Sequence, residues 1–223
     1  MIADVNDLSI YLRATNIIDS DNPDIVRLSR KLMEGSQNER DLARRLFIFV
    51  RDRIIYDPYT PFFLPEHFRA SNVLKRGRGF CIHKASLLCA LLRASGIPCR
   101  IGFATVRNHL ATEQLLEFLG SDIFPYHAYV EIFLSGKWVK ATPAFNRELC
   151  ERFKVPPLDF DGENDAIFQA YNLEERKFME YVEFLGVYDD IPVEQIVRGF
   201  EEAYGEERVR MWRENYMIKG SLR

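Results

Sequence analysis

Apolar residues recur at helical spacing in the middle of the chain. Between Cys81 and Gly96 they return every three or four positions, which predicts a helix with one buried face. Gly96 and Pro98 then end the pattern as a helix stop does. A glycine-containing approach, residues 77–79, precedes it, so we expect Cys81 at the start of this helix. The predicted buried positions are Ile82, Ala85, Leu88, Cys89 and Leu92.

Two further helical patterns precede this segment. Asn22-Pro23-Asp24 predicts a helix start, because proline suits the first turn, and Gly35 predicts the end of that helix. Ser36 or Asn38 is expected to cap the next helix, which the Asp57-Pro58 pair stops. The predicted apolar face of this second helix is Leu42, Leu46, Phe47, Phe49 and Val50, with Ile54 extending it.

The hydrophobic pattern after the Cys81 helix favours strands. Residues 99–106, 126–134 and 137–141 are typical of strands, and Ser135-Gly136 between the last two is a two-residue hairpin signal. Residues 112–119 predict a short helix or lid segment.

The pattern weakens beyond Pro143. Residues 155–165 form a connection rich in proline and aspartate, and residues 178–185 are apolar and aromatic but fit no single state. Residues 192–203 and 206–216 have strong helix-forming composition and predict two C-terminal helices.

The order of these elements predicts the α+β class: helices, then the Cys81 helix, then an antiparallel sheet, then a helical tail. We expect a single domain over residues 1–223, with a core of about 24–146 and an extension, 150–223, packed on it. A chain of 223 residues can bury roughly 70% of its unfolded surface, which is enough for one sizeable core.

Composition narrows the classes of function. Thirty basic and 33 acidic side chains, with a net charge of −3, give no reason to expect nucleic acid as a partner. The acidic N-terminus lacks signal-peptide features and no apolar run reaches the ~20 residues that span a bilayer, so no membrane association is expected. Four cysteines do not form a disulfide framework, and the histidines and cysteines lack zinc-ligand spacing. We therefore expect a cytoplasmic protein with reduced thiols and without a metal or cofactor.

Cys81 and His127 are the candidate reactive residues. At a helix start, Cys81 meets unsatisfied N–H groups and the positive end of the helix dipole, which both favour a thiolate. His127 lies near the start of the predicted strand 126–134. A cysteine at a helix N-terminus and a strand histidine are the pair that nucleophilic acyl chemistry requires. The backbone N–H of Cys81 is expected to donate to an oxyanion.

Three segments carry a family resemblance. They are residues 51–56 (RDRIIY), the stretch from Gly79 to Arg100 around Cys81, and His127-Ala-Tyr-Val-Glu131 with Trp138 eleven residues after His127. In this order they resemble the transglutaminase-like superfamily over about residues 24–146. The resemblance implies a papain-like α+β fold and a cysteine–histidine site, in a family of transglutaminases, proteases and amidases.

One position departs from that pattern. The family usually has an aspartate four residues after the hairpin tryptophan, to orient the histidine, and this chain has Thr142 there. Threonine accepts a hydrogen bond but cannot balance an imidazolium charge. Asn146 shares the face by two-residue alternation, and papain-like enzymes use asparagine as the orienting residue. Carboxylates that could fold back as substitutes are Asp159, Asp161 and Asp165.

Structural interpretations compete with the functional ones. Cys81 alone fits a small buried core residue, and His127 alone fits a strand histidine bonded to backbone. Cys89 and Cys99 are expected to pack in the core. The apolar residues of 62–68 are expected to cover the core rather than to line a substrate groove. A local basic cluster is either solvated or attracts an acidic substrate: Arg76, Arg78 and Arg100.

The leading hypothesis is a cysteine enzyme in which Cys81 attacks an amide carbonyl and His127 acts as base and acid. Thr142 or Asn146 orients the imidazole. Hydrolysis of a peptide or isopeptide-like amide is favoured over crosslinking, because no calcium-site loop is evident. The alternatives are a degenerate fold that binds a peptide or protein, and acyl transfer from a thioester donor, as in the arylamine acetyltransferases of related fold. The substrate, the oligomeric state and the role of residues 150–223 stay open.

Overall fold

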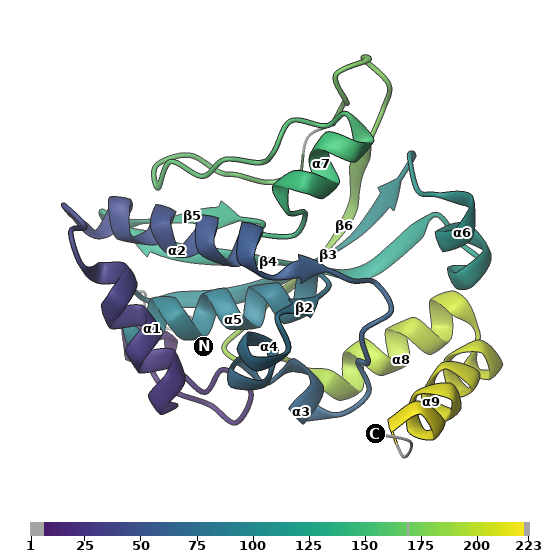
Figure 1. Cartoon of the computed structure of the whole chain (residues 1–223), viewed down its shortest axis with the longest axis horizontal. Helices are drawn as coiled ribbons and strands as arrows, with labels where there is room; N and C mark the ends of the chain where they lie inside the picture. Colours follow the sequence, from purple (N-terminus) through teal and green to yellow (C-terminus); the bar gives the residue numbers. More distant parts are fainter. Residues whose placement is uncertain (1–6, 169, 221–223) are drawn as a thin grey trace.

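Helices surround a central antiparallel sheet in the computed structural model, which describes residues 7–168 and 170–220 (Figure 1). The α+β class predicted from the sequence is confirmed. The helices are the 3-10 turn η1 (Leu8–Tyr11), α1 (Pro23–Met33), α2 (Glu39–Arg53), α3 (Pro65–Phe68), α4 (Ala70–Arg76), α5 (Cys81–Ala94), α6 (Glu113–Leu119), α7 (Arg147–Phe153), α8 (Val193–Tyr204) and α9 (Glu206–Gly220). The strands are β1 (Ile55–Tyr56), β2 (Arg78–Gly79), β3 (Cys99–Asn108), β4 (Ile123–Leu134), β5 (Lys137–Ala141) and β6 (Met179–Tyr188).

Side-chain caps fix the starts of the N-terminal helices. The Asn22 side chain accepts a hydrogen bond from the N–H of Asp24 at the start of α1, and Asn38 accepts one from the N–H of Asp41 at the start of α2. Asn38 is therefore the cap of the second helix, and Ser36 is not. None of the helices in the described ranges is long and apolar enough to cross a bilayer.

Helix α5 is buried on nearly every side, which corrects the prediction of one buried face. Residues 82–93 are all buried. The reason is its central position, since α1, α2 and α4 pack around it while β3 and β4 contact it from the sheet. Lys84 lies inside this packing and donates hydrogen bonds to the carbonyl oxygens of Arg51 (2.8 Å) and Ile54 (2.6 Å). These bonds tie α5 to the end of α2.

The four-stranded sheet has the order β5-β4-β3-β6, with antiparallel neighbours throughout. The predicted hairpin is confirmed, because β5 pairs with β4 and the turn residues Ser135 and Gly136 both have positive φ (51° and 84°). A two-residue turn of this kind matches the twist of the flanking strands. All of the undecided segment 178–185 except its first residue lies within β6, the edge strand paired with β3.

Two hydrophobic clusters pack on the sheet. The main cluster contains α5 and the inward-facing residues of β3 and β4, and the second contains Ala104, Val106 and Tyr129 with residues between 145 and 181. Ile196, Phe200 and Val209 of the C-terminal helices are buried in the main cluster. The extent of the domain, 1–223, stays a prediction.

Candidate functional site

Cys81 is the first residue of α5, as the sequence predicts. The preceding residue, Phe80, makes no side-chain cap to the first N–H groups of the helix. Backbone N–H groups of Ala128, Ile82 and Cys81 itself interact with the sulfur. Ala128 belongs to β4, so the thiol lies where the start of α5 meets that strand.

The start of α5 is held in place by its approach segment. β2 pairs in parallel with β1, and the N–H groups of Ile55 and Asp57 donate to the carbonyl oxygens of Gly77 (2.9 Å) and Gly79 (3.1 Å). Lys84 anchors the next turn of α5 to the end of α2. The position of Cys81 is therefore fixed by the β1–β2 pairing before it in the sequence and by the Lys84 hydrogen bonds after it.

A backbone irregularity in β4 precedes His127. The register between β3 and β4 shifts between Ala104 and Val106, and Tyr126 has a left-handed φ of 53°. Such a bulge redirects the side chains that follow it, and a positive φ at an aromatic residue is strained. The imidazole of His127 is only 4% exposed and packs against the ring of Phe168, with 4.3 Å between ring centroids.

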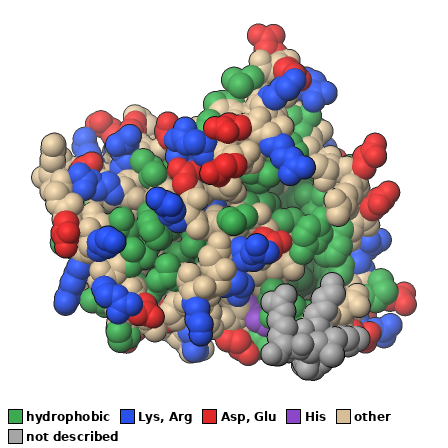
Figure 2. All heavy atoms as spheres, viewed as in Figure 1, with side chains coloured by type: hydrophobic (Ala, Val, Ile, Leu, Met, Phe, Trp, Pro, Cys, Tyr) green, Lys and Arg blue, Asp and Glu red, His purple; other side chains and the backbone are tan. Residues whose placement is uncertain are grey.

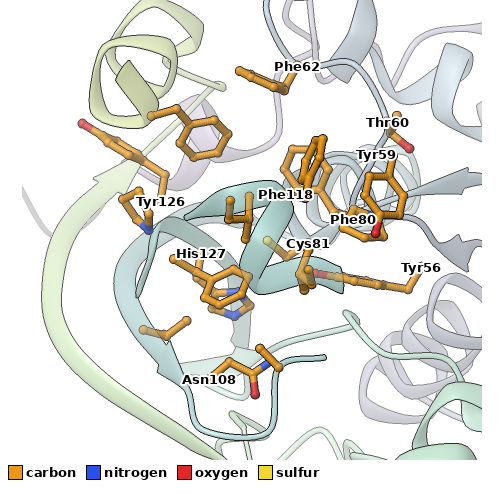
Figure 3. A pocket seen from close by; sticks show the side chains of 18 of the residues that line it. Tyr56, Tyr59, Thr60, Phe62, Phe80, Cys81, Asn108, Phe118, Tyr126 and His127 are labelled. Carbon is orange, nitrogen blue, oxygen red and sulfur yellow. The ribbon is translucent and has the colours of Figure 1, made fainter. Parts of the chain in front are cut away.

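Cys81 and His127 line one cavity of about 230 Å³. Figure 3 shows both in the middle of a ring of aromatic side chains, with Tyr56, Tyr59 and Phe62 among its walls. On the surface, hydrophobic side chains gather around a hollow between the loop before α3 and α6 (Figure 2). The structure thus brings the two predicted reactive residues to one apolar pocket.

The resting pair is neutral, which differs from the thiolate expected from the sequence. Burial raises the pKa of the Cys81 thiol to about 11, and the three backbone N–H groups offset only part of that rise. Cys81 is nevertheless only half-buried by accessible surface, and it lines the pocket. Burial alone lowers the pKa of His127 to about 3. Within the described chain, Nε2 of His127 has no hydrogen-bond partner.

The residues proposed to orient His127 have different surroundings. Thr142 is buried, and its Oγ1 makes no hydrogen bond to any described residue. Asn146 instead accepts a hydrogen bond from the N–H of Tyr56 (3.2 Å) and donates to Oε2 of Glu148 (2.7 Å). Its amide is therefore engaged away from the imidazole, and orientation of His127 by either residue stays a prediction.

The three aspartates considered as substitutes are also engaged elsewhere. Asp159 pairs with the buried Arg51 (2.6 Å), and Asp165 accepts a hydrogen bond from the N–H of Lys140 (2.8 Å). Asp161 accepts hydrogen bonds from the N–H and side-chain amide of Asn164 (both 2.8 Å). Each carboxylate stabilises a local turn or ion pair.

Sequence reasoning missed Tyr181, which lies on β6 behind the imidazole. Its ring contacts that of His127, with 6.2 Å between centroids. Burial raises the pKa of Tyr181 to about 12, and the contacts of its hydroxyl with Thr142 and with the backbone of Phe168 offset part of that rise. Neither hydroxyl makes a hydrogen bond of good geometry to a described residue. No local signal could have found Tyr181, because its strand pairs with distant β3.

Two interpretations of the surrounding residues need correction. Phe62 and Phe63 line the pocket, so segment 62–68 does more than cover the core. The three basic residues also do not gather at the pocket. Arg100 pairs with Glu131 (2.7 Å) and stacks on Trp138. Arg76 donates to the carbonyl oxygen of Arg78 (3.0 Å), Arg78 pairs with Asp57 (3.5 Å), and neither lines the pocket.

Two of the remaining cysteines pack in the core, as predicted. Cys89 and Cys99 are buried in the main cluster, and Cys99 donates to the carbonyl oxygen of Cys89 (3.4 Å). Among the residues that the structure describes, no group of three or more His, Cys, Asp or Glu side chains could hold a metal ion.

Solved structures with a related arrangement have low sequence identity to this chain. A protein from Cytophaga hutchinsonii proposed to be a cysteine protease is 16% identical, with a TM-score of 0.49, and the match covers 84% of this chain and 56% of that one. A proposed protease from Parabacteroides distasonis is 19% identical (TM-score 0.38; 60% and 25% covered). The periplasmic domain of TgpA from Pseudomonas aeruginosa, bound to ethylmercury, is 20% identical (TM-score 0.44; 67% and 52% covered).

This chain thus spans between a quarter and just over half the length of those solved structures. None of the curated proteins matches the sequence significantly. The model of the transglutaminase-like superfamily matches residues 26–143, more than half of the chain. That segment contains both Cys81 and His127, and the protein therefore belongs to the transglutaminase-like superfamily.

Proposed function

We propose that the protein is a cysteine hydrolase that cleaves an amide through Cys81 and His127. The observation that carries this proposal is the position of the Cys81 sulfur. It lies at the uncapped start of a buried helix, faces three backbone N–H groups and shares a pocket with an imidazole. These are the parts that acyl chemistry needs: a nucleophile, a base and donors for an oxyanion.

The reaction follows from these roles. The sulfur of Cys81 adds to the amide carbonyl carbon while His127 accepts the thiol proton, and the backbone N–H groups donate to the oxyanion. The C–N bond then breaks, and the imidazolium returns the proton to the leaving amine. Water attacks the thioester, His127 takes a proton from it, and the acid leaves as the thiol is restored.

The neutral resting state sets when proton transfer occurs. With a thiol pKa of about 11 and an imidazole pKa of about 3, a thiolate–imidazolium pair is unfavourable in the empty pocket. The proton is therefore transferred as the sulfur attacks, once the carbonyl oxygen can take up negative charge beside the N–H groups. Thr142, beside Tyr181 behind the imidazole, is the candidate to hold the ring during this step.

A second candidate function is a binding module without catalysis. The observation that favours it is the same neutral pair, together with the imidazole Nε2 that has no partner among the described residues. A module that only holds a peptide has no need of an activated thiol.

Measurement of peptide cleavage distinguishes the hydrolase from the binding module. The protein is incubated with a mixture of peptides of known sequence, and the products are identified by mass spectrometry for wild type, Cys81→Ala and His127→Ala. We expect cleavage by wild type, loss of more than a thousandfold in Cys81→Ala, and a loss of a hundredfold or more in His127→Ala. His109→Ala is the matched control, since His109 lies outside the pocket and pairs with Glu180. Binding of peptides without cleavage would support the module instead.

A further inference from the structure

The pocket wall is built from aromatic side chains of several elements. The loop after β1 contributes Tyr59 and Phe62, α6 contributes Phe118, and the C-terminal helices contribute Phe200 and Trp212. These rings are packed against one another. Phe118 stacks on Trp212 with 4.6 Å between centroids, and Phe62 lies 4.9 Å from Phe200. The wall is therefore a connected surface and not a chance exposure of single rings.

The described lining of the pocket is uncharged. Among the described residues that line it, none is Asp, Glu, Lys or Arg. His127 is neutral there, and the remaining polar side chains of the described lining are the Cys81 thiol, hydroxyl groups, the amide of Asn108 and the indole N–H of Trp212. A carboxylate or an ammonium group that entered would lose its hydration without gaining a counter-ion, which is strongly unfavourable.

The size of the cavity limits what can enter. An apolar cavity of about 150 Å³ accommodates a benzene molecule, and this cavity measures about 230 Å³. It therefore holds one aromatic ring or a branched alkyl group together with the atoms that link it to a carbonyl. It is larger than an acetyl group needs.

We propose that the acyl side of the substrate carries one large, uncharged, apolar group that fills this aromatic pocket beside Cys81. The inference rests on the proposed hydrolase function and names its substrate class. For a peptide, the residue that supplies the cleaved carbonyl is then aromatic or a large aliphatic residue. Glutamate, lysine and glycine are poor at that position, the first two because of charge and the third because the cavity stays unfilled.

The test is a series of N-acetyl-X aminomethylcoumarin amides, with X being Phe, Leu, Gly, Glu or Lys, measured as kcat/KM. Burial of a phenyl group favours binding by about ten- to a hundredfold. We expect the Phe and Leu amides to exceed the Gly, Glu and Lys amides at least tenfold. In parallel, the Cys81→Ala variant is titrated calorimetrically with N-acetyl-X-amides of the same series.

The two measurements separate the two proposals. Turnover without preference for Phe or Leu overturns the substrate class and keeps the hydrolase. Selective binding of the Phe ligand without turnover by wild type overturns the hydrolase and keeps the pocket preference. Absence of both turnover and selective binding overturns both.

A matched pair of variants tests the pocket itself. Leu115 lines the pocket from α6, and its neighbour Leu116 does not, although both are half-buried. Leu115→Arg places a cation at the pocket wall, and we expect it to lower kcat/KM for the Phe amide and to raise it for the Glu amide. Leu116→Arg is the control and should leave the Phe-to-Glu ratio unchanged. An equal change of that ratio in both variants would contradict the proposal.

Discussion

The protonation state of Cys81 is decided by two opposing effects at one atom. The start of α5 supplies N–H groups that favour the thiolate, and enclosure by protein atoms disfavours it. Enclosure is the larger effect. The candidate pair was predicted from the helix start at Cys81, the strand at His127 and the family resemblance. Its charge could not be predicted, because burial depends on residues far away in the sequence.

Alkylation by iodoacetamide should report this state. A thiol pKa of about 11 leaves Cys81 with a thiolate fraction at pH 7 roughly 300-fold below that of a free thiol with a pKa of about 8.5, so we expect slow alkylation at this pH. We expect the labelling rate of the Cys81 peptide, followed by mass spectrometry, to rise up to at least pH 10. The profile should be the same in His127→Ala, because the imidazole is already neutral. A midpoint below 8.5 that disappears in His127→Ala would show an ion pair instead.

The Tyr181 hydroxyl, whose contacts have poor hydrogen-bond geometry, leads to a second prediction at the scale of one residue. Its OH is buried without a hydrogen bond of good geometry to the described residues, and such a group costs about 1–3 kcal/mol. We expect Tyr181→Phe to raise the free energy of unfolding by about 1 kcal/mol in urea denaturation.

Tyr188→Phe is the control on the same strand. Its hydroxyl donates to Oε1 of Gln195 (3.0 Å) at the surface, so its removal should lower stability slightly or not at all. If Tyr181→Phe is destabilising, the hydroxyl is bonded after all, and Thr142 is the partner to examine.

At the scale of elements, α8 supports the bulge that precedes His127. Gly199 of α8 lies against the Tyr126 ring, and a Cβ at this position would come within 2.3 Å of that ring. Glycine is thus required here by the close approach of an aromatic side chain. The strained backbone of Tyr126 persists because this packing holds its side chain.

Gly199→Ala should therefore destabilise the protein, although helix propensity alone favours alanine over glycine. In an open helix the change would stabilise by about 1 kcal/mol. Here we expect a loss of about 1–3 kcal/mol from overpacking, and a fall in kcat greater than tenfold as His127 is displaced. Thermal unfolding and turnover are measured together. Arg198→Ala, at an exposed neighbouring position of α8, is the control, and an equal effect in both variants would remove the special role of Gly199.

Helix and hairpin positions were predictable because their signals are local. The Asn22 and Asn38 caps, the Ser135-Gly136 turn and the start of α5 at Cys81 all lie within a few residues of what they control. Strand β6 could not be predicted in this way, because it pairs with β3, and the paired residues are more than 70 positions apart in the sequence. The aromatic pocket was missed for the same reason, because its walls come from distant segments of the chain.

At the scale of the whole molecule, buried neutral histidines make the fold sensitive to acid. Burial lowers the pKa of His127 to about 3, of His67 to about 4, and of His83 further below its ordinary value. In the unfolded chain these imidazoles take up protons below pH 6.5, and in the folded protein they do not. Stability is therefore complete above pH 6.5 and falls as the pH is lowered towards 4 and 3.

Substitution of His127 should show how much of this acid-induced loss of stability is due to that residue. Between pH 7 and 4.5 we expect wild type to lose roughly 3 kcal/mol more of its free energy of unfolding than His127→Gln does. His109→Gln, at a partly exposed site, should track wild type. Urea denaturation at a series of pH values measures this difference, and parallel curves for His127→Gln and wild type would contradict a neutral buried imidazole.

The residues that line the pocket come from two stretches of the chain, one within the family match and one after it. Cys81 and His127 lie within the family match at residues 26–143, whereas Phe145, Phe168, Phe200 and Trp212 of the pocket wall lie beyond it. Substitutions in the later stretch can thus reshape the pocket while the proposed reactive residues, Cys81 and His127, stay the same. Relatives that share the first stretch and differ in the second should therefore keep one reaction and diverge in what they accept, so exchange of residues 144–223 between them offers a direct route to altered selectivity.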